Sequence, residues 1–235
     1  MGSHPILSGR DCLRERFQIF FDGWLQRQQS FLDQLLLVSA CPDSHEKVER
    51  QRTLVDQVLS HYQEYYEEKA RTAWEDVFTV FSAPWLSPFE RTFLWIGGFK
   101  PLFVLRLVSN VVGGDLTSDQ SRVIERLKQE TSQAERELNE MIAKVQESVA
   151  APPLLASARR LGRLMDGRIS NLEEAIETLK NAMLRVLESA DELRWSMVRK
   201  VIEVLSPDQT VKFLVAAAEF QLRMRRWGLQ GTKTG

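Results

Sequence analysis

The sequence has few cysteines and histidines, no excess charge of either sign and no long hydrophobic run. Its 235 residues include two cysteines and three histidines, so it offers neither a disulfide scaffold nor a zinc finger. Lys and Arg number 31 against 32 Asp and Glu, and a chain without net positive charge lacks the overall field that attracts nucleic acid or anionic lipid. The most apolar stretch, residues 102–108, contains Arg106 and is much shorter than the roughly 20 residues of a membrane span. These absences predict a soluble intracellular globular protein.

Prolines are also sparse, and they divide the chain into long segments with helical periodicity. They stand at positions 5, 42, 84, 88, 101, 152, 153 and 207. Between them, apolar residues recur three and four positions apart, which favours helices, and no strict alternation typical of strands is found. The spacing predicts helices over about 11–38, 45–81, 88–96, 102–112, 117–150, 170–205 and 207–227, with an apolar and basic stretch at 154–167 that forms either a short helix or a mobile connection.

The predicted fold class is therefore all-α, a bundle of six to seven mostly antiparallel helices, several of them long. We expect a single helical domain over residues 11–228. Residues 1–10 are expected to be a disordered N-terminus or the remnant of a tag, and residues 229–235 a disordered tail.

Apolar stripes predict the buried face of the longer helices. In the segment 45–81 the stripe consists of Val48, Val55, Leu59, Tyr62, Tyr66, Ala70, Trp74, Val77 and Phe81. In the segment 117–150 it consists of Val123, Leu127, Ala134, Leu138, Met141, Val145 and Val149. The most regular stripe has alternating steps of four and three, which indicates either a seam within the bundle or a dimer interface; it consists of Leu172, Ile176, Leu179, Met183, Val186, Ala190, Leu193 and Met197.

Capping residues mark several predicted helix ends. Ser87, Pro88 and Glu90 form the pattern of a capping box, in which a serine and a glutamate satisfy each other's backbone N–H groups. Gly97-Gly98 is predicted to stop the short helix that follows, with positive φ. Gly228 is expected to form the C-cap of the last helix.

Motifs of catalysis or metal binding are not found. The sequence contains no HExxH, GxSxG, P-loop or EF-hand pattern, and its histidines are far apart. We interpret His61 as the partner in an ordinary interhelical hydrogen bond. Cys12 and Cys41 lie at opposite ends of one predicted helix, too far apart to form a disulfide with each other. The sequence therefore favours a protein that is not an enzyme and carries no cofactor or metal.

Two features favour binding instead. The last helix ends in a basic amphipathic segment with Arg223, Arg225, Arg226 and Trp227. These cations either complement the helix dipole, or contact an acidic or calmodulin-type partner, or contact nucleic acid, in that order of preference. The second feature is a concentration of aromatic residues around 17–31 and 74–103, which can leave a cavity for an apolar ligand such as a fatty acid within the helical core.

One long motif resembles a known family. The segment Trp85-Leu-Ser-Pro-Phe-Glu-Arg-Thr-Phe-Leu-Trp-Ile-Gly-Gly-Phe99 is similar to the signature of the plant delay-of-germination (DOG) domain, which also occurs in the C-terminal halves of TGA-class bZIP transcription factors. Further matches, such as Phe20-Phe21-Asp-Gly-Trp24 and Arg226-Trp227-Gly228, extend the resemblance over about residues 12–228. The signature residues are Trp85, Pro88, Glu90, Arg91, Phe93, Leu94, Trp95, Gly97, Gly98 and Phe99. We interpret this segment as packing rather than as the contact with a partner, with Glu90 and Arg91 tying helix ends together.

The resemblance implies a non-enzymatic plant regulatory protein that acts through protein partners. Coactivators, phosphatases and bZIP factors are the partner types that it implies, in seed dormancy and germination or, in a divergent branch, in the positioning of pollen apertures. Because the first predicted helix begins near residue 11, we expect a stand-alone member without a basic region. Sequence-specific DNA binding then belongs to the TGA relatives, no direct contact with nucleic acid is expected, and the location is nucleus, cytoplasm or both.

One departure from the family pattern concerns haem. The founding seed-dormancy member has two histidines four residues apart in its last helix, associated with haem binding. Gln221 and Arg225 stand at the matching positions of this chain. Because arginine is not an ordinary axial ligand and glutamine would be an unusual one, we expect no haem at this position.

Overall fold

The computed structural model describes residues 9–150 and 169–231. The helices are α1 (Gly9–Ser39), α2 (His45–Ser82), α3 (Pro88–Arg91), α4 (Pro101–Val112), α5 (Ser118–Ala150), α7 (Ile169–Val204) and α8 (Pro207–Gly231), with a 3₁₀ turn, η1 (Gly113–Asp115), after α4. The described residues contain no strand, and one isolated bridge pairs Trp95 with Gly98. The predicted all-α class is confirmed. The predicted stretch at 154–167 lies outside the described residues.

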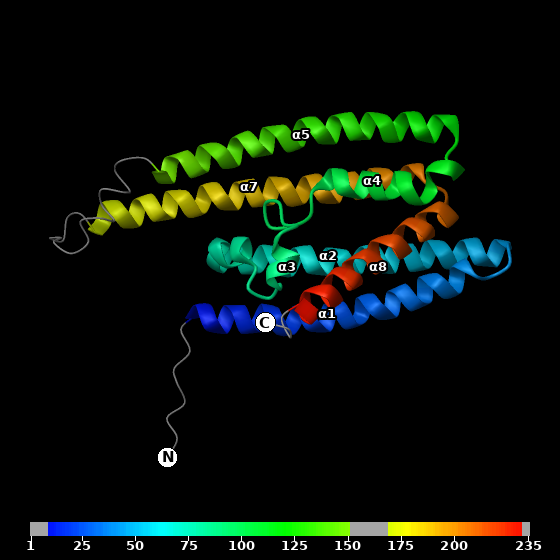
Figure 1. Cartoon of the computed structure of the whole chain (residues 1–235), viewed down its shortest axis with the longest axis horizontal. Coiled ribbons are helices and arrows are strands. Elements are labelled where there is room, and N and C mark those ends of the chain that lie inside the picture. The colour runs from blue at the N-terminus through cyan, green and yellow to red at the C-terminus, as the bar shows by residue number, and fades with distance from the viewer. Residues whose placement is uncertain (1–8, 151–168, 232–235) are drawn as a thin grey trace, which may run out of the picture.

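Two antiparallel helix pairs and a crossing helix make up the bundle. Figure 1 shows α5 and α7 side by side, α1 and α2 as a second pair below them, and α8 crossing in front of α2. α8 packs against α1, α2, α3 and α4. The C-terminal helix therefore holds together elements that are far apart in the sequence.

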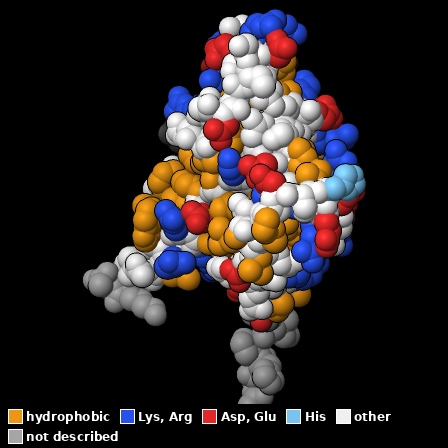
Figure 2. Space-filling view, turned by 90° about the vertical axis from the view of Figure 1, so that its right-hand side faces the viewer, with side chains coloured by type: hydrophobic (Ala, Val, Ile, Leu, Met, Phe, Trp, Pro, Cys, Tyr) orange, Lys and Arg blue, Asp and Glu red, His pale blue; other side chains and the backbone are white. Residues whose placement is uncertain are grey.

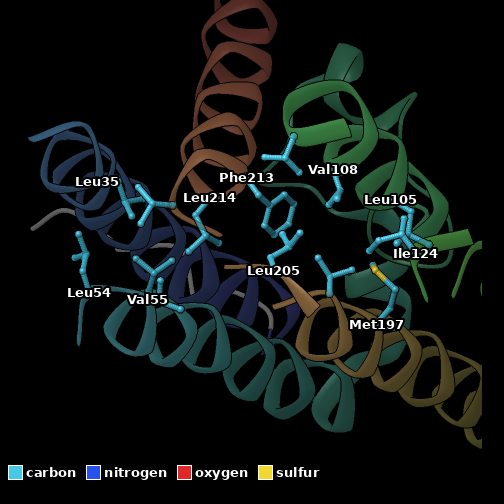
Figure 3. Packing of buried hydrophobic residues seen from close by; sticks show 14 of the residues in the cluster. Leu35, Leu54, Val55, Leu105, Val108, Ile124, Met197, Leu205, Phe213 and Leu214 are labelled. Carbon is cyan, nitrogen blue, oxygen red and sulfur yellow. The ribbon is translucent and has the colours of Figure 1, made fainter. Parts of the chain in front are cut away.

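The main core lies where α1, α2, α4, α5, α7 and α8 converge, as seen in Figure 3. Side chains such as Leu35, Leu105 and Val201 are completely buried there. Each large apolar side chain buried in this way stabilises the fold by about 1.5 to 3 kcal/mol. A second, largely aromatic cluster lies between α1, α2, α7 and the segment after α2. It contains Phe17, Phe21, Trp24, Ala73, Val77, Val80, Ala83, Trp85 and Leu187.

The predicted buried faces hold in part. Trp74, expected to point inward, is 71% exposed. The predicted stripe passes through Tyr62, Tyr66, Ala70 and Trp74 in three consecutive steps of four. Because each such step turns about 40° past a full helical turn, Trp74 lies about 120° around α2 from Tyr62, away from the neighbouring helices.

In α5 the buried face is also shifted. Val123 and Met141, expected to be inward, are each more than a third exposed, whereas Ile124 is buried. Glu135 is buried as well, because its carboxylate accepts a hydrogen bond from the Leu102 N–H at 2.8 Å. A buried carboxylate with a backbone partner cannot be recognised from apolar spacing.

The regular stripe of α7 packs within the bundle. Val186 and Ala190 are buried in a cluster with Leu138 of α5 and Ile96. This agrees with the first of the two interpretations, a seam inside the molecule, while the dimer interface stays a prediction. The side chains of Leu172 and Val149 lie outside the described residues, and Ile176 is 38% exposed.

The short helix after Ser87 ends earlier than predicted. α3 stops at Arg91, and the chain then forms a loop in which Ile96 and Gly97 have φ of 46° and 66°. The prediction of a helix to residue 96 is wrong because backbone carbonyls of this loop accept hydrogen bonds from the Arg194 guanidinium instead of from a following helical turn. Gly97 has the predicted positive φ, but within a loop.

The last helix continues beyond its predicted end. Gly228 was expected to be a C-cap, yet α8 runs on to Gly231. The glycine is needed for close approach instead, because a Cβ at this position would lie 2.0 Å from the Ser87 Oγ.

Candidate partner-binding site

The capping box at the start of α3 is formed as predicted. The Ser87 Oγ accepts a hydrogen bond from the Glu90 N–H at 3.2 Å, and the Glu90 carboxylate accepts one from the Ser87 N–H at 2.8 Å. The Ser87 hydroxyl also donates to this carboxylate at 2.6 Å. Glu90 is thereby fixed in a buried position that faces α8.

Arg225 joins three elements at this point. Its Nη1 donates to the Trp85 carbonyl at 2.9 Å and lies 3.3 Å from the Glu90 carboxylate, while its Nη2 lies 3.3 Å from the Asp22 carboxylate on α1. The side chain is 15% exposed. Glu90 therefore ties helix ends together, as expected, whereas Arg91, for which the same role was expected, is exposed. Arg225, predicted as a partner contact, is engaged within the junction of α1, α3 and α8.

The other three predicted partner residues lie on the outer side of α8. Arg223 is exposed and pairs with Glu219 of the same helix at 3.0 Å. Arg226 is exposed, and Trp227 is 55% exposed. Of the predicted set, these side chains are open to a partner.

Sequence reasoning missed the apolar neighbours of these residues. Phe89 and Phe93 are both exposed and form an edge-to-face pair with centroids 5.3 Å apart. Leu229 is exposed as well. Since Gly228 lies against Ser87, the end of α8 and α3 adjoin. We call the resulting area the α3–α8 surface; it consists of Phe89, Arg91, Phe93, Arg226, Trp227 and Leu229.

The interpretation of the signature segment as packing holds for only part of it, because Phe89, Arg91 and Phe93 are exposed. Trp85 is buried against Phe17, with centroids 4.0 Å apart. A Cβ on Gly97 would lie 2.7 Å from Leu187, and one on Gly98 would lie 2.9 Å from the Arg194 Cζ. Among the other signature residues, Pro88 at the start of α3 and Arg91 are exposed, and Leu94, Trp95 and Phe99 are half-buried.

Behind this loop lies a buried group of charges. Arg194 Nε donates to the Phe99 carbonyl at 2.8 Å, and its Nη1 pairs with Asp191. Lys69, 1% exposed, places its Nζ 2.8 Å from the same carboxylate. Burial lowers the pKa of Lys69 to about 8, although the Asp191 charge opposes this change. The loop is thus anchored to α7 through Arg194, and Asp191 links α7 to Lys69 of α2. These pairings could not be predicted from the sequence.

An internal cavity of about 190 Å³ lies beneath α8. Its wall is largely aromatic and aliphatic, including Trp24, Tyr62, Phe103 and Phe220. The charged and amide side chains in the wall are Lys69, Glu90, Arg194, Gln221 and Arg225. Its size is comparable to that of engineered apolar cavities that hold one aromatic ring, about 150 Å³.

The positions compared with the haem-associated histidines carry other chemistry. The Gln221 Oε1 lies 3.4 Å from the Gln28 Nε2 and 3.5 Å from the Tyr62 hydroxyl, and Arg225 is ion-paired. An amide and a guanidinium already bound to protein groups do not fit a haem iron. Within the described ranges, no group of three or more His, Cys, Asp and Glu side chains is placed to hold a metal.

His61 is placed differently from the prediction. Its ring stacks on Trp24, with centroids 4.4 Å apart and planes 7° apart. Neither ring nitrogen has a hydrogen-bond partner in the described part of the chain; instead the His61 carbonyl accepts from the Trp24 Nε1 at 2.8 Å. The predicted side-chain hydrogen bond is therefore wrong, because the imidazole acts as an aromatic surface. Burial lowers its pKa to about 4, with a smaller contribution from Arg27.

The face seen in Figure 2 carries charges of both signs. Figure 2 shows Lys and Arg mixed with Asp and Glu, and hydrophobic side chains exposed between them. Among the helices described, none combines the length and the hydropathy that crossing a bilayer requires.

The comparisons with known proteins agree with the signature. Residues 34–110 match the DOG1 family model, described as seed dormancy control. Protein RESPONSE TO ABA AND SALT 1 of Arabidopsis thaliana is 42% identical over 90% of this chain and 94% of its own length. The chain belongs to the DOG1 family. Protein ZW2 of the same plant is also 42% identical, over 92% of this chain and 97% of its own length.

The relation to TGA factors is confirmed as well. Transcription factor TGA5 of Arabidopsis thaliana is 31% identical over 89% of this chain, which corresponds to 62% of that protein. This DOG-domain chain is thus related to part of a transcription factor and belongs to a family of plant regulatory proteins.

Proposed function

We propose that this chain is a protein-interaction module that acts in transcription-linked control of seed dormancy and germination. The observation that carries the proposal is the α3–α8 surface: two adjoining helices leave Phe89, Phe93, Trp227 and Leu229, together with Arg91 and Arg226, individually exposed. Trp and Arg are the residues most enriched among those that dominate binding energy in protein interfaces. The described family of seed dormancy control supports the process.

The rigidity of this surface supports docking by a preformed face. The capping box, Arg225 and the close contact of Gly228 fix α3 and α8 relative to each other. A surface that is ordered before binding loses little conformational entropy when a partner docks. The partner types in the proposal are a coactivator, a phosphatase or a bZIP factor. Calmodulin, an acidic protein, is a further candidate because the end of α8 is basic.

Nucleus and cytoplasm are both included in the proposal, since several relatives are transcription factors. Direct binding to nucleic acid is not part of it. The formal net charge is −1, and most of the affinity of proteins for nucleic acid comes from neutralising phosphates.

Affinity capture from seed extract tests the proposal. The bait is the full chain, beside a variant with Phe93→Ser, Arg226→Glu and Trp227→Ser, and a control with Val123→Ser and Arg122→Glu on the exposed side of α5. We expect specific regulatory proteins to be retained by the wild type and the control, and lost from the triple variant. Equal retention of the same regulatory proteins by all three baits would exclude the α3–α8 surface as their binding site.

A second candidate function is the binding of an apolar ligand in the core, supported by the cavity beneath α8. The cavity volume fits a compact molecule or part of a fatty acid chain. Because most of the wall is apolar, an apolar ligand fits better than a polar one. Native mass spectrometry of the protein purified from plant tissue tests this: a ligand at one copy per chain supports it, and only ligand-free protein opposes it.

The affinity capture also tests the developmental process. If the proteins captured by this chain are also partners of relatives that act in pollen development, the process would be aperture positioning instead of germination.

A further inference from the structure

A hollow of about 630 Å³ runs along the surface between α2 and α7. All of its lining residues come from these two helices, so it is separate from the α3–α8 surface, and it is more open than the cavity beneath α8. Two helices that flank a hollow offer a groove of the kind in which an amphipathic helix is bound.

The floor of this α2–α7 groove is apolar. Ala70 and Ala73 of α2 have small side chains that leave space between the helices, and Leu184, Leu187 and Trp195 of α7 line the opposite wall. Leu187 and Ala73 belong to the aromatic cluster beneath. The floor is therefore supported by packed core and does not need to rearrange to receive a partner.

The rim of the groove is acidic. Glu67 stands on the α2 side, and Glu188 and Glu192 stand on the α7 side, against one cation, Arg199. In the described part of the chain none of these three carboxylates forms an ion pair, and the Glu67 carboxylate accepts a hydrogen bond from the Gln63 Nε2 at 2.9 Å. A fourth carboxylate, Asp191, differs from them because Lys69 and Arg194 neutralise it from inside.

The spacing of the rim carboxylates adds to this contrast. Glu188 and Glu192 are four positions apart on one face of α7, where like charges destabilise a helix by a few tenths of a kcal/mol. A cation between Glu188 and Glu192 would offset this repulsion, and a second cation could pair with Glu67. An acidic helix would increase the repulsion, and a neutral one would leave it unchanged.

We propose that the α2–α7 groove binds a basic amphipathic helix of a partner protein. Leu and Ala side chains of that helix would pack on Ala70, Ala73 and Leu184, and Lys or Arg side chains along its edges would pair with Glu67, Glu188 and Glu192. This contact goes beyond the proposed function, because it uses other helices and the opposite charge from the α3–α8 surface. A chain with both surfaces can hold two partners at once.

Fluorescence anisotropy with two designed peptides tests the proposal. The first is a fluorescein-labelled amphipathic helix of about 18 residues, five turns, built from Leu, Ala and Lys; in the second, Glu replaces every Lys. We expect the Lys peptide to bind the full chain and the Glu peptide not to bind. Equal binding of the two peptides, or no binding of the Lys peptide, would contradict the proposal.

Variants of the full chain locate the contact. Glu188→Lys with Glu192→Lys, and separately Ala70→Trp, should each weaken binding of the Lys peptide by at least about tenfold. The matched control, Glu140→Lys with Glu147→Lys on exposed positions of α5, should change it by less than about twofold. An equal loss of Lys-peptide binding in the control would mean that the peptide is attracted by the overall negative charge and not by the groove, and would overturn the proposal.

The same titration separates this inference from the proposed function. The variant with Phe93→Ser, Arg226→Glu and Trp227→Ser should bind the Lys peptide as the wild type does. Circular dichroism of every variant checks that the helices are retained.

Discussion

Gly228 and Ser87 illustrate how single residues position the proposed docking surface. The helix α8 crosses α3 so closely that a methyl group on Gly228 would overlap the Ser87 hydroxyl. The helix backbone at Gly228 is ordinary α-helix, so the requirement is for space, not for an unusual φ. Glycine in a helix costs about 1 kcal/mol relative to alanine, and here that cost is offset by the contact.

Replacing Gly228 by alanine should therefore destabilise the protein, by about 1 to 3 kcal/mol through overpacking. Urea denaturation measures the loss. Gly113→Ala is the control, because a Cβ there meets nothing within 4 Å and helical glycine to alanine is neutral or stabilising. In a Ser87→Gly background, which lacks the hydroxyl that the new methyl group would overlap, Gly228→Ala should cost less than it does in the wild type. An equal cost in both backgrounds would mean that the contact is not the cause.

His61 gives a second prediction for a single residue. Its folded pKa of about 4 lies below the ordinary value of 6.5, so between these values the unfolded chain binds a proton that the folded chain does not. Stability is then complete above pH 6.5 and decreases as the pH falls through 4. The pKa difference corresponds to a loss of about 2 to 3 kcal/mol between pH 7 and pH 4.5.

The variant His61→Phe keeps an aromatic ring on Trp24 and removes the titration. Between pH 7 and pH 4.5, the free energy of unfolding in urea should fall by about 2 to 3 kcal/mol less for this variant than for the wild type. An identical pH dependence of the two proteins would show that His61 is not buried in its neutral form.

At the scale of elements, the loop between α3 and α4 depends on α7. Arg194 donates to the carbonyls of Trp95, Ile96 and Phe99 and pairs with Asp191. Removing one partner from a buried ionic network leaves polar groups without partners. Arg194→Ala should destabilise the protein by about 3 to 5 kcal/mol.

Two further measurements make this test specific. Arg194→Lys should also lose most of this stability, because one ammonium group cannot reach three carbonyls and a carboxylate in the same geometry. Arg199→Ala, exposed on the same helix, should change it by less than about 0.5 kcal/mol. A loss below about 1 kcal/mol for Arg194→Ala would contradict the anchoring of the loop.

The starts of several helices were predictable from local signals, whereas the ends of α3 and α8 and the contacts between elements were not. The proline and capping residues predicted the starts of α2, α3, α4 and α5 because those signals act within one helical turn. The end of α3 and the continuation of α8 through Gly228 depend on Arg194 and Ser87, which are distant in sequence. Trp74 was misplaced for a related reason, since a small error in helical phase accumulates over a long helix.

The candidate site shows the same division. Arg223, Arg226 and Trp227 could be selected from composition, and the structure leaves them exposed. The ion pairs of Arg225 within the fold and the position of Phe89 near the end of α8 could not be predicted from composition, because both depend on how α8 crosses α3.

At the scale of the whole molecule, the chain presents two surfaces of different chemistry on one helical bundle. The α3–α8 surface is aromatic and basic, and the α2–α7 groove is apolar with an acidic rim. Val186 and Ala190 of α7 pack against Leu138 of α5, and the residues of both surfaces come from one chain. Such an arrangement suits a protein that brings regulators together.

Hydrogen–deuterium exchange of the full chain with and without a captured regulatory partner tests the central claim most directly. The account predicts that the partner slows exchange in residues 88–93 and 223–231, which form the α3–α8 surface, while residues 140–148 at the far end of α5 exchange as before. Slower exchange confined to other parts of the molecule, with residues 88–93 and 223–231 unchanged, would contradict it.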